Sequence, residues 1–174
     1  YGQRFTWDGV AVGGQMTIED GNIGHSCGCY DHRDSEYDPT IAITSSGLFV
    51  VAWRDRHGDN NGSSYIQAKR YQIDNGNALN AFTVEGTHGA ATSQYEPSVA
   101  MVDDGRFVIT WRGAEEIYAR LFSADGDAVS ATFMVNQTTS GSQSYPSVAM
   151  YPDGQFLVSW QGNGDGDDAG IFGR

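Results

Sequence analysis

The residue types best suited to chemistry are concentrated in "HSCGCYDHRD" (25–34), which holds both cysteines and two of the four histidines. Two thiolates and two imidazoles could bind zinc, but one residue between Cys27 and Cys29 is tighter than the usual spacing of roughly two to four. Two cysteines in a secreted chain more often form a disulfide bond. We therefore expect a Cys27–Cys29 disulfide, with zinc binding, free thiols or pairing with another subunit as alternatives.

Two other segments, "RDRHGDNNGSS" (54–64) and "QGNGDGDDAG" (161–170), alternate Asp or Asn with Gly. Oxygen-rich loops of this kind suit Ca²⁺, which takes about six to eight oxygen ligands. Neither segment has the complete EF-hand pattern with its terminal Glu, so solvated turns are the alternative. The candidate calcium ligands are Asp55, Asp59, Asn61, Asn163, Asp165, Asp167 and Asp168.

No arrangement typical of nucleophilic catalysis stands out. His57 lies close to Asp55 in the sequence, but no serine in a nucleophile-elbow context accompanies them. Aromatic residues in loops could instead form platforms for sugar rings. The candidate ligand-binding residues are Tyr30, Tyr37, Tyr65, Tyr95 and His57.

A repeat determines which elements would position these residues. "YDPTIAITSSGLFVVAW" (37–53), "YEPSVAMVDDGRFVITW" (95–111) and "YPSVAMYPDGQFLVSW" (145–160) each place a tryptophan 14 positions after a proline. Each copy predicts two strands joined by a hairpin at "SSG", "DDG" or "PDG". Because Trp53, Trp111 and Trp160 recur at one position, we expect them in the core rather than on sugars.

A second pair of strands follows the first in two copies, in "YIQAKRYQIDNGNALNAFTVEG" (65–86) and "EIYARLFSADGDAVSATFMVNQ" (116–137). The N-terminal segment resembles this second pair without its first, and the C-terminus ends as the third strand of the last copy begins. The repeat is therefore split between the two ends of the chain.

The sequence accordingly predicts an all-β domain of three four-stranded propeller-type blades. The first spans 39–86 and the second 97–137. The third is split between 146–174 and 1–20, and 21–38 is an inserted loop. A β-trefoil or a β-prism is the alternative, because both also contain three four-stranded units.

Three spans carry a family resemblance: "PSVAMVDDGRFVITW", "IYARLFSADGDAV" and "WQGNGDGDDAGIFGR". They resemble tandem repeats of very large secreted or surface proteins of bacteria. The resemblance covers nearly the whole chain except residues 20–35. It implies an extracellular, propeller-like module, often beside calcium-binding or adhesive segments, and brings no catalytic motif.

The composition limits the kinds of partner that the chain is expected to bind. A chain of 174 residues with 39% hydrophobic residues can form one domain with a sizeable core. Its net charge of −12 argues against nucleic acid and anionic membranes. No apolar run approaches the roughly 20 residues of a membrane span.

The predicted loops at one edge of the blades vary widely in length, and variable loops on a rigid scaffold tend to carry function. We therefore expect a non-catalytic extracellular or cell-surface module for recognition or adhesion, in particular a lectin with calcium-dependent loops that binds glycans. A structural subunit of a surface filament and a secreted hydrolase are the alternatives.

Assembly follows from the split repeat. Three blades close a propeller with difficulty, since typical propellers have about four to eight. The half-blades at the two ends are complementary, so we expect a head-to-tail homo-oligomer, either a six-bladed dimer or a filament, with strands at 1–20 pairing beside those at 146–160 of a neighbour.

Overall fold

The computed structural model describes residues 1–18, 35–56, 63–73, 78–85, 93–164 and 167–174. Within these ranges the regular structure consists of antiparallel strands and contains no helix, which confirms the prediction of an all-β chain. It follows that no helix among the described residues could cross a membrane.

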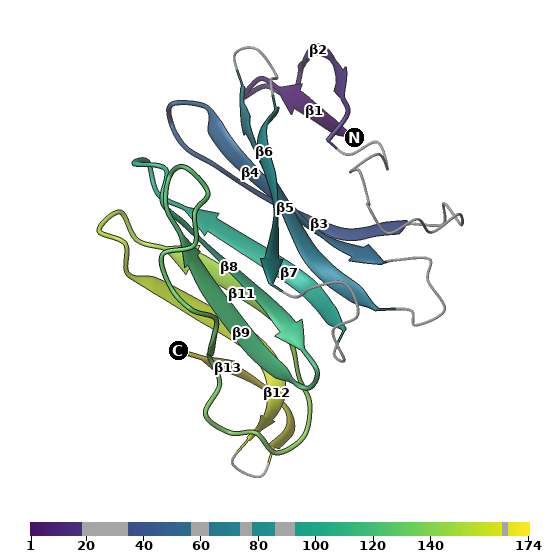
Figure 1. The fold of residues 1–174 in the computed structure, drawn as a ribbon, viewed down its shortest axis with the longest axis vertical. Helices are drawn as coiled ribbons and strands as arrows, with labels where there is room; N and C mark the ends of the chain where they lie inside the picture. Colours follow the sequence, from purple (N-terminus) through teal and green to yellow (C-terminus); the bar gives the residue numbers. More distant parts are fainter. Residues whose placement is uncertain (19–34, 57–62, 74–77, 86–92, 165–166) are drawn as a thin grey trace.

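The strands form three successive sheets and a separate N-terminal hairpin (Figure 1). The hairpin contains β1 (Gly2–Phe5) and β2 (Ala11–Met16). Unit 1 contains β3 (Ser35–Ile43), β4 (Leu48–Arg56), β5 (Ser64–Gln72) and β6 (Ala78–Glu85). Unit 2 contains β7 (Gln94–Met101), β8 (Phe107–Gly113), β9 (Glu116–Phe122) and β10 (Phe133–Met134). Unit 3 contains β11 (Gln143–Met150), β12 (Phe156–Gly164) and β13 (Asp167–Gly173).

The turns predicted between the first two strands of each unit are present and depend on glycine. Gly47 and Gly105 have φ angles of 83° and 90°, a region that L side chains rarely adopt. A Cβ on Gly105 would also lie 2.8 Å from the Cβ of Ala124, in the next turn of its own unit. These glycines therefore set the hairpins, and the hairpins set the strand register.

Each unit has two different faces, and the faces alternate through the molecule. We call front the face that carries the Phe, Val or Ile, and Trp of the second strand, and back the opposite face with smaller residues. The front of unit 2, with Phe107 and Trp111, packs on the back of unit 1, with Val50 and Ala52. The front of unit 3, with Trp160, packs in the same way on the back of unit 2.

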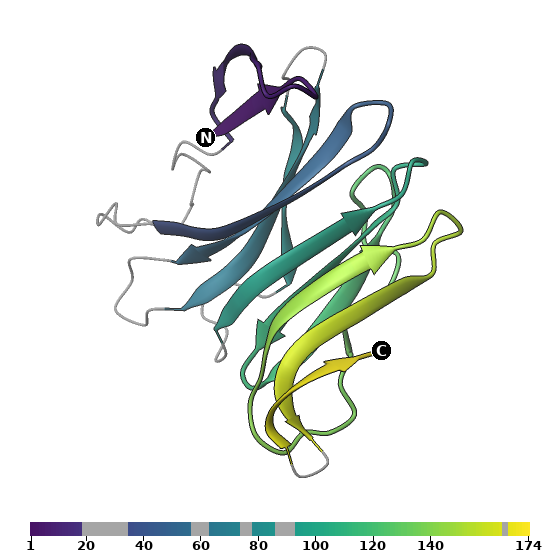
Figure 2. The same ribbon diagram turned by 180° about the vertical axis from the view of Figure 1, so that it is seen from behind.

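All three repeated tryptophans are buried, so their assignment to the core is confirmed. Burying an apolar side chain of this size contributes about 1.5–3 kcal/mol or more, and the same arrangement recurs at successive interfaces. Packing of front on back therefore accounts for the order of the units along the molecule (Figure 2).

The hairpin packs on the front of unit 1, where Met16 and Ile18 contact a cluster that includes Phe49 and Trp53. The guanidinium of Arg4 donates a hydrogen bond to the carbonyl oxygen of Ile73 (3.0 Å). The hairpin thus stands where a further unit would precede unit 1, and the two chain ends lie at opposite ends of the molecule (Figure 1).

Unit 3 does not take its third strand from the N-terminus within one chain. Its own β13 pairs along β12, with Phe172 opposite Trp160 and Ile171 opposite Gln161. The third-strand position is therefore occupied. Completion of this blade by residues 1–20 of another chain stays a prediction.

Candidate functional site

The first strands of the units run close to one another, and their first residues form one edge of the molecule. β7 contacts both β3 and β11, so residues that begin these strands come together although they are about 50 positions apart in the sequence. This edge also contains the ends of the second strands, because neighbouring strands are antiparallel. The variable loops leave from here.

A shared backbone irregularity marks this edge. Asp38, Glu96 and Tyr145 each precede a proline and have φ angles of 54°, 55° and 52°. Residues with a side chain rarely adopt a positive φ angle, because this backbone conformation costs on the order of 1–3 kcal/mol. A break in strand register at each position accommodates the extra residue. Local strain of this kind is concentrated at functional sites, and here it orients two carboxylates.

Both carboxylates face arginines of the neighbouring second strand. Arg54 Nη1 lies 3.5 Å from Asp38 Oδ2, and Arg112 Nε lies 3.4 Å from Glu96 Oε2. Arg112 Nε makes no hydrogen bond, so its contact with Glu96 is purely ionic. Glu96 Oε2 also accepts a hydrogen bond from the backbone N–H of Tyr145 (2.7 Å), which connects units 2 and 3.

The same arginines stack on tyrosines. The guanidinium carbon of Arg54 lies 4.4 Å from the ring centre of Tyr37 and 5.3 Å from that of Tyr95. Arg112 lies 4.7 Å from the ring of Tyr95. We call this series (Tyr37, Arg54, Tyr95, Arg112) the Tyr–Arg ladder; it joins unit 1 to unit 2.

The ladder does not continue into unit 3. Ser144, Tyr145 and Gln161 stand at the positions of the tyrosine, the acid and the arginine. The edge is therefore chemically asymmetric: units 1 and 2 present carboxylates, arginines and tyrosines, whereas unit 3 presents neutral side chains.

A pocket of about 330 Å³ opens beside the ladder on the front of unit 1. Its lining residues are Tyr1, Ile18, Glu36, Tyr37, Pro39, Val51 and Trp53. Trp53 is only 3% exposed, and its indole Nε1 has no hydrogen-bond partner. A buried donor without a partner costs about 1–3 kcal/mol, and this nitrogen is itself buried, so it is the ring of Trp53 that lines the pocket.

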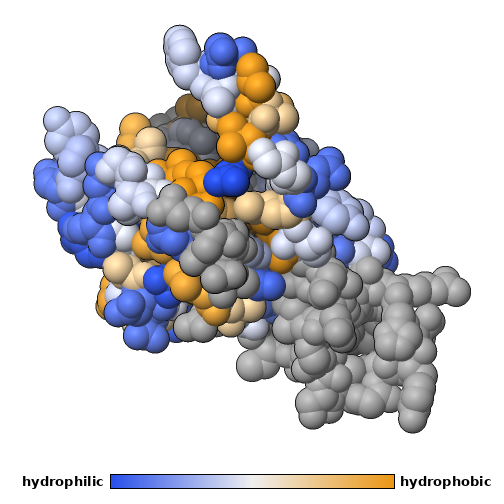
Figure 3. Space-filling model, turned by 90° about the horizontal axis from the view of Figure 1, so that it is seen from above, coloured by the Kyte–Doolittle hydropathy of each residue, from blue (hydrophilic) through white to orange (hydrophobic). Residues whose placement is uncertain are grey.

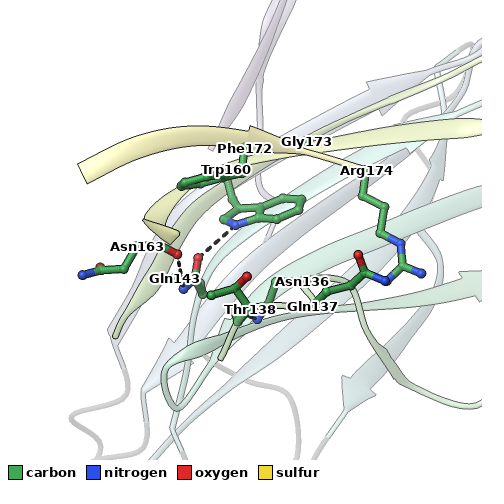
Figure 4. A pocket seen from close by; sticks show the side chains of 9 residues that line it. All are labelled: Asn136, Gln137, Thr138, Gln143, Trp160, Asn163, Phe172, Gly173 and Arg174. Carbon is green, nitrogen blue, oxygen red and sulfur yellow. Dashed lines mark hydrogen bonds between the residues drawn. The ribbon is translucent and has the colours of Figure 1, made fainter. Parts of the chain in front are cut away.

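The equivalent tryptophan of unit 3 has a partner. Trp160 Nε1 donates to Gln143 Oε1 at 3.0 Å (Figure 4). Glu36 and Gln143 each stand three positions before the proline of their unit. Unit 1 thus has a carboxylate where unit 3 has an amide, and its indole N–H remains unpaired.

A second, smaller pocket of about 180 Å³ surrounds this pair, and Figure 4 shows the side chains that line it. The ring of Phe172 stacks on Trp160 with centres 6.4 Å apart. Gln143 Nε2 also donates to the carbonyl oxygen of Asn163 (3.3 Å). Trp160 and Gln143 therefore satisfy each other, unlike Trp53 and Glu36 of unit 1.

The pKa of some groups departs from its ordinary value, and these groups lie away from the edge. The backbone N–H of Ser45 donates to Asp103 Oδ1 at 2.7 Å and lowers the pKa of that carboxyl group. Backbone and side-chain hydrogen bonds from Arg106 lower the pKa of Asp104. Both carboxylates belong to the turn at the other end of unit 2, so they serve the fold.

The predicted ligand-binding tyrosines divide into three groups. Tyr37 lines the larger pocket, and Tyr95 lies in the ladder. Tyr65 is buried, so the expectation of an exposed platform is wrong there: β5 begins at Ser64, and Tyr65 pairs with Asp55 inside the sheet. Tyr30 and His57 lie outside the described residues.

Two of the predicted calcium ligands have described side chains, Asp55 and Asn163, and they lie in different units. Asp55 is buried near the end of β4 in unit 1, and Asn163 lies in β12 of unit 3. Asp167 and Asp168 begin β13. Among the described residues, no three His, Cys, Asp or Glu side chains are grouped as a metal site. Asp59, Asn61, Asp165, Cys27 and Cys29 lie outside these residues, so the calcium and disulfide predictions stay predictions.

Several residues of this edge were not among the sequence candidates: Glu36, Asp38, Trp53, Arg54, Glu96 and Arg112. A signal for them exists. Tyr–acid–Pro and Trp–Arg occur together in the first two copies of the repeat and are both absent from the third. The difference between the copies of the repeat was therefore a better indicator of this edge than the lengths of the loops.

Neither a protein-family model nor a curated protein sequence matches the chain. Among solved structures, it is similar to an endo-arabinase from Bacteroides thetaiotaomicron, with a TM-score of 0.49, 14% identity and coverage of 77% of this chain and 54% of the other. It is also similar to an α-L-arabinanase from Penicillium chrysogenum complexed with arabinobiose, with a TM-score of 0.50, 11% identity and coverage of 74% and 42%.

The chain spans about half the length of these solved proteins, 54% and 42%. At such low identity the likeness concerns the fold, and it is consistent with a propeller-type arrangement of sheets. It corrects the leading functional prediction. The solved protein with the TM-score of 0.50 is named an arabinanase, so a non-catalytic module for recognition or adhesion is no longer the leading interpretation, and the function of this chain is a matter of proposal.

Proposed function

We propose that this chain is part of a secreted β-propeller hydrolase that acts on polysaccharides, arabinose-containing polymers being the first class to test. The observation that carries the proposal is the acidic and aromatic edge of unit 1, where Glu36 lines the Trp53 pocket and Asp38 stands between two other lining residues, Tyr37 and Pro39. The similarity to arabinanases supports the substrate class.

Glycoside hydrolysis requires two carboxyl groups, one as proton donor and one as base or nucleophile. We assign the donor role to Glu36, because it lines the pocket. Its proton would pass to the glycosidic oxygen as the bond to the anomeric carbon breaks. Asp38 would take a proton from the water that attacks this carbon, and Arg54 holds Asp38 in place.

The pocket offers the usual features of sugar recognition. Aromatic rings of Tyr1, Tyr37 and Trp53 provide apolar surfaces for a sugar ring, and Glu36 provides a polar group for a sugar oxygen. A few directional polar groups among aromatic walls fix the orientation of a ligand.

The test is release of reducing ends from a panel of polysaccharides that includes arabinan. We expect Glu36→Gln and Asp38→Asn each to lower kcat by at least about a hundredfold, with unchanged thermal melting because both side chains are exposed. Asp153→Asn, in the exposed turn of unit 3, is the matched control. No release from any polymer, or full activity of both variants, would refute the proposal.

Three further predictions from the sequence belong to this proposal. A head-to-tail homo-oligomer would supply the remaining blades of a closed propeller or extend into a filament. Ca²⁺ bound by 54–64 and 161–170 would stabilise the loops, and a lower melting temperature in EDTA that Ca²⁺ restores would support it. The resemblance to repeats of bacterial surface proteins agrees with secretion.

A further inference from the structure

The back face of unit 3 is apolar and uncovered. Leu157 is 59% exposed and Ile171 is 77% exposed. The residues at the same positions of unit 2 are Val108 and Ile117, and both are 0% exposed. The two faces thus carry similar side chains and differ in whether another unit covers them.

The two interfaces within the chain show what kind of surface packs on a back face like that of unit 3. Val108 and Ile117 pack against Val158 and Trp160 on the front of unit 3. One unit earlier, the back of unit 1 packs against the front of unit 2 in the same manner. The same packing of back on front occurs at both interfaces, so the back of unit 3 is built to receive another front face.

An incompletely covered front face exists at the opposite end of the molecule. Ile41 in β3 is 62% exposed, whereas Val99 at the same position of unit 2 is 7% exposed. The N-terminal hairpin corresponds to the third and fourth strands of a unit, so it covers only part of unit 1. Tyr1 and Phe5 on the hairpin are also exposed. Figure 3 shows hydrophobic surface gathered on this end.

We propose that the back face of unit 3 binds the N-terminal end of a second copy of this chain, where Ile41 and Phe5 are exposed. Each chain carries the two different halves of one interface at opposite ends, which favours head-to-tail association over a symmetric dimer. Exposed apolar patches of this kind mark sites of protein association.

The copies pack face to face in this arrangement. The sequence predicts strand pairing between the ends, but β13 already fills the third-strand position of unit 3 and β1 corresponds to the same strand. Packing of faces requires neither strand to move. It also repeats the two interfaces that exist within the chain.

The experiment measures the association of the intact chain by sedimentation velocity across a micromolar concentration series. The variant Ile171→Asp alters only the C-terminal half of the interface, and Ile41→Asp alters only the N-terminal half. We expect each to raise the dissociation constant at least about tenfold. Val129→Asp, at an exposed apolar residue between β9 and β10 of unit 2, is the matched control and should associate as the native chain does.

Mixing the two variants gives the decisive measurement. In a head-to-tail interface, the intact N-terminal end of Ile171→Asp fits the intact back face of Ile41→Asp, so the mixture should form dimers that neither variant forms alone. A native chain that stays monomeric over the series would overturn the proposal, and so would a mixture without dimers. Circular dichroism melts confirm that the variants fold, and none of these outcomes depends on hydrolase activity.

Discussion

Trp53 and Trp160 occupy the same position in two units and differ in the partner of the indole nitrogen. Trp160 donates to Gln143, whereas Trp53 has Glu36 at the corresponding position and makes no hydrogen bond. Replacement by phenylalanine separates the two roles, because it removes the N–H and keeps an aromatic ring.

We expect Trp53→Phe to weaken binding of an arabino-oligosaccharide about tenfold, because the indole ring lines the pocket. Both replacements leave a cavity in the core and so lower the free energy of unfolding. Trp160→Phe should lower it by about 1–3 kcal/mol more, because the buried Gln143 amide also loses its donor. Calorimetric titration and urea unfolding measure the two effects. Equal losses of stability in both variants would contradict the assignment.

Asp103 gives a prediction for pH. Its hydrogen bond from Ser45 joins the turns of units 1 and 2 and lowers the pKa of the carboxyl group in the folded state below the unfolded value of 3.8. The stabilisation is therefore complete above that value and is lost as the pH falls through the folded pKa.

Asp103→Asn should accordingly lower the urea midpoint at pH 7 and have a progressively smaller effect below pH of about 4. Urea titrations of both proteins across this range provide the measurement, with Glu115→Gln as a control at another exposed carboxylate. A difference in midpoint that stays constant down to low pH would count against the contact.

Between elements, the Tyr–Arg ladder is one of several polar connections between units 1 and 2. Tyr95 is its central ring, with Arg54 on one side and Arg112 on the other. Tyr95→Leu should destabilise the fold by about 1–2 kcal/mol, because each cation–π contact contributes about 0.5–1 kcal/mol. Tyr145→Leu in the exposed position of unit 3 should have no effect on unfolding by urea. Equal effects of both changes would remove the ladder as a stabilising element.

The elements themselves were largely predictable from the sequence. Two-residue periodicity and the Gly-containing turns identified the paired strands of each copy, and the invariant tryptophans identified the core. The candidate site was not predictable, because its ion pairs form between neighbouring strands. Arg54 contacts Asp38 across a break in strand register, and the two-residue periodicity of a strand does not reveal such a break. Tyr65 was misplaced for a related reason: it pairs with Asp55 across neighbouring strands and is buried inside the sheet.

At the scale of the molecule, the three repeated sheets and the incomplete segments at both ends also followed from the repeat. The sequence placed the start of a third strand at the C-terminus, where β13 is found, but it did not indicate that the N-terminal hairpin would pack on unit 1 at the other end of the molecule. The place of the hairpin depends on which face of a unit packs against its neighbour. The sequence does not show this, because it does not show which side chains of different units are in contact.

The coverage of faces also has a consequence for local opening of the native state. Unit 2 has both faces covered, whereas unit 3 has one bare face and unit 1 a partly covered one. In a stack of repeats, stability is roughly the sum of each repeat and its contacts with immediate neighbours, so the ends fray first. Native-state amide hydrogen exchange should therefore be slowest in β8 and β9, intermediate in β4 and β5, and fastest in β12 and β13. Uniform protection across the three sheets would mean that the chain opens only as a single cooperative body.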